Sequence, residues 1–138
     1  MKLSEHFTLE ELTFSETASR RGINNEPSEV EIDNLKKLAT NVLEPIRQQI
    51  NLPIHINSGY RSPEVNLIVG GKSNSQHLKG EAADMVAIGL SVTQFYNRIK
   101  SMFDSKLLQV DQCIIEYKRW VHISYREGKN RNQFFAIS

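Results

Sequence analysis

The sequence predicts an α+β domain, in which helices from the first half of the chain pack on a small, mostly antiparallel sheet from the second half. The longest helical pattern covers residues 28–50, and three strand-like segments follow one another after residue 110. The chain has 138 residues, of which 39% are hydrophobic, enough for one core. We therefore expect residues 1–138 to form a single domain.

The first predicted helices are short. Thr8 opens a Thr-x-x-Glu capping box, which predicts a helix over about residues 9–12. A second helix is expected over residues 15–21, because Gly22 suits the left-handed conformation that ends many helices. Residues 24–27, Asn-Asn-Glu-Pro, are expected to form a loop.

Ser28 can cap a long amphipathic helix over residues 28–50, with acidic residues in its first turn. Pro45 lacks a backbone N–H, so we expect it to kink or divide this helix. The apolar face recurs at steps of three and four residues and consists of Ile32, Leu35, Leu38, Val42, Ile46 and Ile50.

Alternating side chains predict a strand over residues 53–57, and a turn follows at residues 58–63. A short helix is expected from Pro63 to Val69, because two glycines end it. The next stretches should be a polar, irregular segment at 72–80 and a strand at 82–87.

A second amphipathic helix should begin at Ser91, which forms a capping box with Gln94. Its apolar side carries Phe95, Ile99, Met102 and Phe103. Three strands are then expected, at about residues 110–117, 120–125 and 133–137.

Composition argues against several classes of protein. Seventeen basic and 16 acidic residues give a net charge of +1, which offers no basis for a nucleic-acid partner. The single cysteine, Cys113, lies in an apolar run and is expected to be a buried core residue. No apolar run approaches the ~20 residues that cross a bilayer, so no membrane insertion is expected. Residues 1–7 lack the apolar core of a signal peptide, which predicts a protein that is cytoplasmic as synthesised.

The most informative motif is Ser-Gln-His-Leu-Lys-Gly-Glu-Ala-Ala-Asp at residues 75–84. It sets His77 and Asp84 seven residues apart, and Gly80 permits the backbone angles that fold them together. A second histidine, His122, follows in Trp-Val-His at residues 120–122. Two histidines and one aspartate can bind Zn²⁺ and leave one position open for water, as in catalytic zinc sites. Alone, His122 would also suit a core position, and His55 and His6 are weaker candidates.

Together these residues resemble the zinc D-Ala-D-Ala carboxypeptidase family, part of a Hedgehog-like group of metallopeptidases that includes phage endolysins and D-Ala-D-Ala dipeptidases. The turn Ser-Gly-Tyr-Arg-Ser-Pro at residues 58–63 and the segment at residues 3–12 extend the resemblance over about residues 3–124. It implies a Hedgehog/D-Ala-D-Ala peptidase-like fold with bound Zn²⁺, held by His77, Asp84 and His122.

The resemblance also assigns Arg61 to catalysis and substrate binding near the metal, where a guanidinium can hold a carboxylate or a developing oxyanion. Ser75 and Gln76 are expected to bond to the substrate or to the outer atom of a metal ligand. Trp120 is expected to line the pocket, although a core or surface position would suit it equally.

The general base departs from the pattern of the wider group. Relatives there often carry Glu-x-x-His, whereas position 119 is an arginine here. Glu116 is the nearest glutamate before His122. A hairpin with a three-residue loop would pair Glu116 with Trp120 and place it on the same face as His122, whereas a two-residue loop would turn it away. We expect Glu116 to be the general base, with Asp111 in reserve.

The resemblance implies a zinc peptidase that hydrolyses peptide bonds in peptidoglycan stem peptides, as a carboxypeptidase or an endolysin-type endopeptidase. Its partner would be that peptide, and we expect a monomer. A phage or prophage lysis enzyme would reach the cell wall only after another protein opens the membrane. The alternatives are a cytoplasmic D-Ala-D-Ala dipeptidase and a non-catalytic, zinc-stabilised binding module of the same fold. The sequence leaves open which bond is cut.

Overall fold

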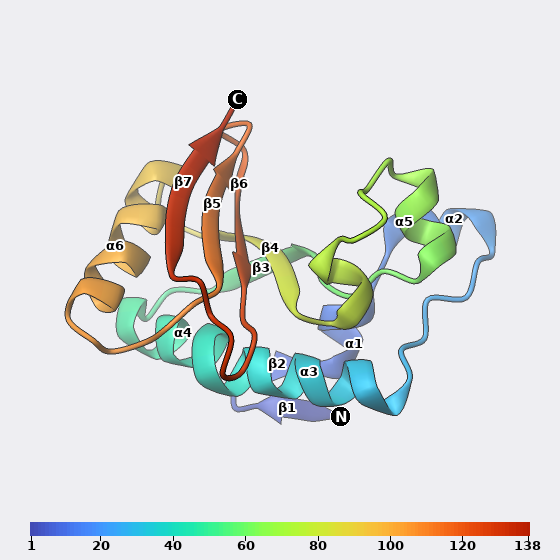
Figure 1. The fold of residues 1–138 in the computed structure, drawn as a ribbon, viewed down its shortest axis with the longest axis horizontal. Coiled ribbons are helices and arrows are strands. Elements are labelled where there is room, and N and C mark those ends of the chain that lie inside the picture. The colour runs from blue at the N-terminus through green and yellow to red at the C-terminus, as the bar shows by residue number, and fades with distance from the viewer.

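The computed structural model describes residues 1–138 and has a five-stranded sheet at its centre (Figure 1). The strand order is β3-β4-β6-β5-β7, and all neighbours are antiparallel except β5 and β7, which are parallel. The expectation of an α+β fold with a mostly antiparallel sheet is therefore confirmed. The strands are β3 (Ile54–Ser58), β4 (Ala82–Ala87), β5 (Gln112–Glu116), β6 (Trp120–Ser124) and β7 (Gln133–Ile137).

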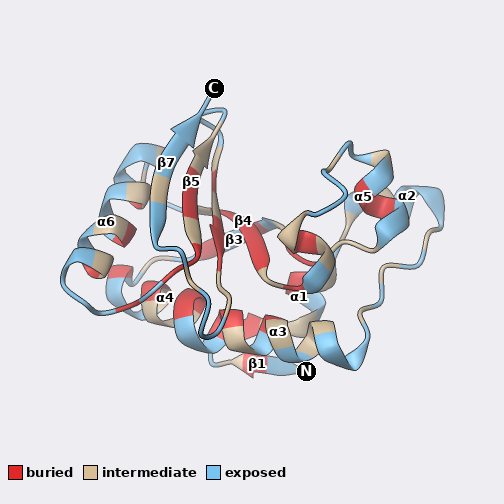
Figure 2. Cartoon of the chain, in the orientation of Figure 1, coloured by how far each residue is buried: buried red, intermediate tan, exposed pale blue.

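The two faces of this sheet serve different purposes, because side chains alternate along each strand. One face joins the hydrophobic core, with Met85, Cys113, Val121 and Ile123 packed beneath the helices. The opposite face of the same strands carries Asp84, Ile114, Glu116 and His122. The edge strand β7 is largely exposed (Figure 2).

Helices cover the core face of the sheet. The helix α6 (Val92–Asp104) begins with the predicted Ser91–Gln94 capping box and packs on β4, β5 and β6. The long helix from the first half of the chain contributes its predicted apolar face to the same core. The two shorter helices before it also form as expected, α1 (Leu9–Thr13) with the Thr8 capping box and α2 (Glu16–Arg21) ended by Gly22 at φ 65°.

The long helix is divided, as Pro45 predicts, into consecutive segments with no break between them. It consists of α3 (Glu29–Leu38), a π-helical turn η1 (Ala39–Leu43) and α4 (Glu44–Ile50). The N–H of Glu44 donates to the carbonyl of Ala39, five residues back. This wider turn lies directly before Pro45, where it accommodates a ring and a missing donor that a regular α-helix would not tolerate.

Two parts of the chain differ from the sequence-based expectations. Residues 2–8 form a two-stranded sheet, β1 (Lys2–Ser4) with β2 (Phe7–Thr8), that was not predicted. The segment expected to be irregular contains a 3₁₀-helix, η2 (Gln76–Lys79), so His77 lies on a helical turn and not in an irregular loop. The helix α5 (Pro63–Ile68) forms where it was predicted and ends before the two glycines. None of the helices is long and apolar enough to cross a membrane.

Candidate metal centre and active site

Three elements bring His77, Asp84 and His122 together. Asp84 on β4 is paired directly with His122 on β6, so the two side chains share the open face of the sheet. The Nδ1 atom of His122 lies 2.9 Å from Oδ1 of Asp84, and Nε2 of His77 lies 3.3 Å from the same oxygen. The possible ligand atoms of all three lie within 4.8 Å of one another. These three residues, called the metal triad below, form the cluster that the sequence predicted.

His77 is oriented by the backbone behind it. Its Nδ1 lies 2.7 Å from the carbonyl oxygen of Gly59, an acceptor, so Nδ1 carries the proton and the lone pair of Nε2 faces Asp84 and can bind a metal. Gly59 has no space for a side chain, because a Cβ would collide with the carbonyl of Leu12. This arrangement matches metal-binding histidines, which donate their second N–H to a carbonyl or carboxylate.

Asp84 is ionised in this setting. Burial alone would raise its pKa, but the adjacent imidazoles of His77 and His122 hold the pKa of this carboxyl well below its usual range. Only 4% of the residue is exposed. A buried anionic oxygen beside two imidazole nitrogens is a donor set that suits Zn²⁺, and three protein ligands leave a coordination position open.

Arg61 lies beside the metal triad, with Nη2 3.6 Å from Oδ2 of Asp84. Its Nε donates to Oγ of Ser58 at 3.2 Å, and its Nη1 donates to Oδ1 of Asn66 at 3.1 Å. Burial lowers the pKa of Arg61, while the nearby carboxylates of Asp84 and Glu116 raise it. The guanidinium is therefore held by Ser58 and Asn66 beside the carboxylate of Asp84.

Asn66 was not identified from the sequence, although it fixes Arg61. It is only 4% exposed, and its amide nitrogen donates to the carbonyl of Lys72 at 2.9 Å. Gly71 packs so closely that an added Cβ would collide with Asn66 and approach Nη1 of Arg61. Asn66 lies within a short helix and belongs to no recognisable motif, so no pattern in the sequence indicates its role. The Gly70-Gly71 pair predicts only the end of that helix.

Glu116 lies on the predicted face. The β5–β6 connection has three residues, and Glu116 is paired with Trp120 and Ile114 with His122. Oε1 of Glu116 accepts a 2.8 Å hydrogen bond from Nε1 of Trp120, the only side-chain hydrogen bond of this carboxylate. The second oxygen has no protein partner. The register expected from the sequence is thus present, while the role of Glu116 as general base stays a prediction.

The other candidates have structural partners. Ser75 caps η2 by accepting from the backbone N–H of His77, and Gln76 donates to Oδ2 of Asp111 at 2.9 Å. Asp111 is fully buried and also accepts from the backbone and side chain of Arg131, so its oxygens are occupied. His55 is exposed on β3, and His6 binds Glu44 at the surface. The structure does not bring His55 or His6 to the metal triad.

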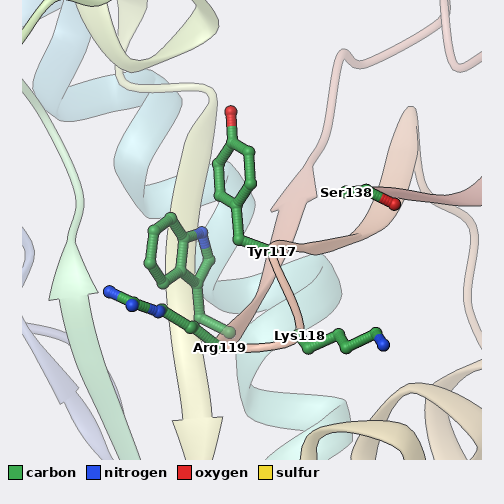
Figure 3. A pocket seen from close by; sticks show the side chains of 5 residues that line it. Tyr117, Lys118, Arg119 and Ser138 are labelled. Carbon is green, nitrogen blue, oxygen red and sulfur yellow. The ribbon is translucent and has the colours of Figure 1, made fainter.

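A groove of about 900 Å³ opens above the metal triad. One wall comes from α2, α5 and the segment before η2, and the other from the open face of β5, β6 and β7. Arg61, Glu116 and Trp120 line it together with the triad. A smaller hollow, of about 530 Å³, lies at the β5–β6 turn around Tyr117, Lys118 and Arg119 (Figure 3).

A buried His-Asp-His cluster at the floor of a groove, on an α+β scaffold, is the donor set of a metal site with one open position, the arrangement that metal-dependent hydrolases use. The match to known families is more specific. The model of a family described as peptidase M15 matches residues 5–124, which include every residue of the candidate site, and the chain belongs to this family. No curated protein matches the sequence significantly. The resemblance to the zinc D-Ala-D-Ala carboxypeptidase family is therefore confirmed.

Proposed function

We propose that this protein is a zinc peptidase that hydrolyses peptide bonds in peptidoglycan stem peptides. The observation that carries the proposal is the placement of Glu116. Its unpartnered carboxylate oxygen lies on the same face of the sheet as the metal triad, in one groove and in a chain of the peptidase M15 family.

The metal would be held by Nε2 of His77, the carboxylate of Asp84 and Nδ1 of His122. When bound, Zn²⁺ supplies a Lewis acid that polarises the scissile carbonyl and lowers the pKa of water. The hydrogen bond from His77 to Gly59 keeps the correct nitrogen directed at the site. Asp84, ionised at neutral pH, provides the negative charge that attracts the ion.

The remaining chemistry falls to Glu116 and Arg61. Glu116 accepts the proton of the attacking water and passes it to the departing amide nitrogen, as a general base and then a general acid. The indole N–H of Trp120 binds one of its oxygens and leaves the other without a protein partner, in a residue that lines the groove. Arg61 stabilises the negative charge that develops on the carbonyl oxygen, and Ser58 and Asn66 restrict its motion.

The shape of the groove supports an extended peptide substrate. It is open to solvent and lined on both walls, and it offers apolar contacts from Phe14, Val65, Val69, Phe135 and Ile137. A peptide laid along it would pass over the metal triad with residues on either side. The bond that is cut, whether at the terminal D-Ala or within the stem, is to be identified by experiment.

The test is mass spectrometry of purified peptidoglycan digested by the zinc-loaded protein, with Glu116→Gln as the matched control. We expect new stem-peptide fragments whose masses name the bond. The variant should retain one zinc per chain while its turnover falls by about 10²–10⁴-fold, the usual contribution of a general base. If Glu116→Gln remains nearly as active as the parent, Glu116 is not the base. Stoichiometric zinc without any fragments would contradict the peptidase and favour the zinc-stabilised binding module.

A further inference from the structure

The β5–β6 turn carries a hollow that the catalytic groups do not use. It is lined by Tyr117, Lys118, Arg119, Trp120 and Ser138. Tyr117 and Trp120 meet edge to face, with ring centroids 5.8 Å apart. Lys118 and Arg119 extend to opposite sides of the turn (Figure 3), so positive charge flanks the aromatic pair.

This hollow shares a wall with the groove above the metal triad. Tyr117 and Trp120 line both spaces. Trp120 also donates its indole N–H to Glu116, and it lies two residues before His122 on β6. Tyr117 and Trp120 therefore link the turn to the groove that contains the metal triad.

The two cations of the turn are free to bind a ligand. Lys118 and Arg119 are exposed, and neither takes part in the ion pairs of the chain. An arginine or lysine at the edge of an aromatic wall can bind a carboxylate while the rings pack on the adjoining carbon atoms. The chemistry of the turn thus favours an anionic group on a partly apolar chain.

The turn has a left-handed backbone conformation that is energetically unfavourable for large side chains. Tyr117 has φ 56° and Lys118 has φ 58°, a left-handed pair of the kind that Asn-Gly normally occupies in two-residue turns. Bulky residues are uncommon in this conformation, and such outliers concentrate at functional sites. The turn thus holds the large side chains of Tyr117 and Lys118 in a backbone conformation that such residues seldom adopt.

We infer that the β5–β6 turn is a subsite for the free α-carboxylate of a γ-linked D-glutamyl residue in the stem peptide, an inference that rests on the proposed function. Arg119 lies three residues before His122, which is about 10 Å along a strand. An extended substrate advances by about 3.3–3.6 Å per residue, so the carboxylate would lie about three residues from the cleaved bond. That spacing matches a glutamyl residue at the second position of a pentapeptide cleaved before its last D-Ala.

The test measures binding without turnover. Trp120 is the only tryptophan of the chain, so its fluorescence reports on this turn directly. The zinc-loaded Glu116→Gln variant, in which the new amide oxygen can still accept from the indole, is titrated with L-Ala-γ-D-Glu-L-Lys-D-Ala-D-Ala. A second titration uses the same peptide with the glutamyl α-carboxylate replaced by a carboxamide.

We expect the carboxylate peptide to bind about 5–10-fold more tightly than the carboxamide peptide. In the same background, Lys118→Gln with Arg119→Gln should remove this difference and leave the affinity for the carboxamide peptide within about twofold. The matched control is Lys36→Gln with Arg98→Gln, which removes the same charge from exposed sites on α3 and α6. The subsite would be overturned if the protein with an unchanged turn bound both peptides equally. It would also be overturned if the control variant lost the preference for the carboxylate peptide.

The outcome is separable from that of the proposed function. If the zinc-loaded parent cleaves neither peptide nor peptidoglycan, while the preference for the carboxylate remains and depends on the turn, the peptidase fails and the subsite stands. If the parent cleaves both peptides with the same kcat/KM and binds them equally, the peptidase stands and the subsite fails.

Discussion

Single residues behind the candidate site set the orientation of its polar side chains. The carbonyl of Gly59 selects the nitrogen of His77 that faces Asp84, and the amide of Asn66 selects the direction of Arg61. Neither residue is a candidate ligand or catalyst. Each restricts the side-chain orientation of a residue that is, His77 or Arg61. A site held in this way needs little rearrangement during a reaction.

Gly71 offers a test of this positioning by Asn66. In Gly71→Ala, the new Cβ collides with Oδ1 of Asn66 and approaches Nη1 of Arg61, so the guanidinium must move. We expect kcat/KM for stem peptides to fall by about 10-fold or more, because small displacements of positioning groups are costly to catalysis. Zinc content should stay at one per chain. Steady-state kinetics and metal analysis measure the two effects.

Gly70→Ala is the matched control for Gly71→Ala. Gly70 has φ 77° and open space around it, so an alanine there strains the backbone without contacting Arg61. We expect about 1 kcal/mol of lost stability and little change in kcat/KM. Equal activity losses in the two variants would show that the effect arises from the loop and not from the guanidinium.

The residues of the metal triad could be predicted from the sequence, because His77, Gly80 and Asp84 stand at a readable spacing and His122 belongs to a separate motif. Asn66, Ser58 and Gly59 could not be assigned a role in the same way. Their contacts with Arg61 and His77 depend on how α5, the end of β3 and η2 meet in space. No pattern within one segment contains that information.

At the scale of elements, Glu44 at the start of α4 holds the N-terminal hairpin β1–β2. Its carboxylate accepts from Oγ of Ser4, from the backbone N–H of His6 and from Gln48, and Nδ1 of His6 lies 2.7 Å away. Burial opposes ionisation, but the bonds from His6, Ser4 and Gln48 lower the pKa of Glu44 to about 2. The hairpin is therefore attached to the long helix by an anion.

This attachment predicts an acid-dependent loss of stability. The folded pKa of Glu44 lies below its unfolded value, so its contribution is complete above about pH 4.5 and is lost as the pH falls toward 2. Because the cluster is in contact with water, we expect on the order of 1 kcal/mol, less than the pKa difference alone would give. Urea unfolding at pH 6 and at pH 3 should show that Glu44→Gln costs stability at pH 6 and much less at pH 3. A cost that is the same at both pH values would rule out this linkage.

Elements with a strong local signal were predictable, and those that depend on distant partners were not. Capping boxes identified the starts of α1 and α6, Ser28 as an N-cap identified the start of α3, and alternation identified β3. The strands β1 and β2 have only three and two residues, too few for alternation to be read. The parallel pairing of β7 with β5 also has no local signature, because it depends on where the chain returns after β6.

At the scale of the whole molecule, the two faces of one sheet have different roles: one contributes to the stability of the fold, and the other carries the candidate site. Its core face belongs to a cluster of 24 buried residues, and its other face carries the metal triad and the groove. The period of two along β4, β5 and β6 produces both faces from the same strands. The site can therefore vary in its loops, such as the β5–β6 turn, without disturbing the core.

The metal would join η2 to the paired strands β4 and β6. Its ligands come from η2, β4 and β6, so zinc binding should stabilise the folded chain by mass action. At a free zinc concentration of 100 times the Kd, the gain is about 2.7 kcal/mol, which corresponds to a rise in Tm of roughly 5–10 °C. Calorimetry with zinc and with a chelator measures this difference.

In Asp84→Asn the rise in Tm on adding zinc should vanish, whereas His55→Ala, which removes an exposed imidazole away from the triad, should keep it. If the Tm of the unsubstituted protein does not respond to zinc, the triad does not bind this metal, and the proposed activity loses its basis.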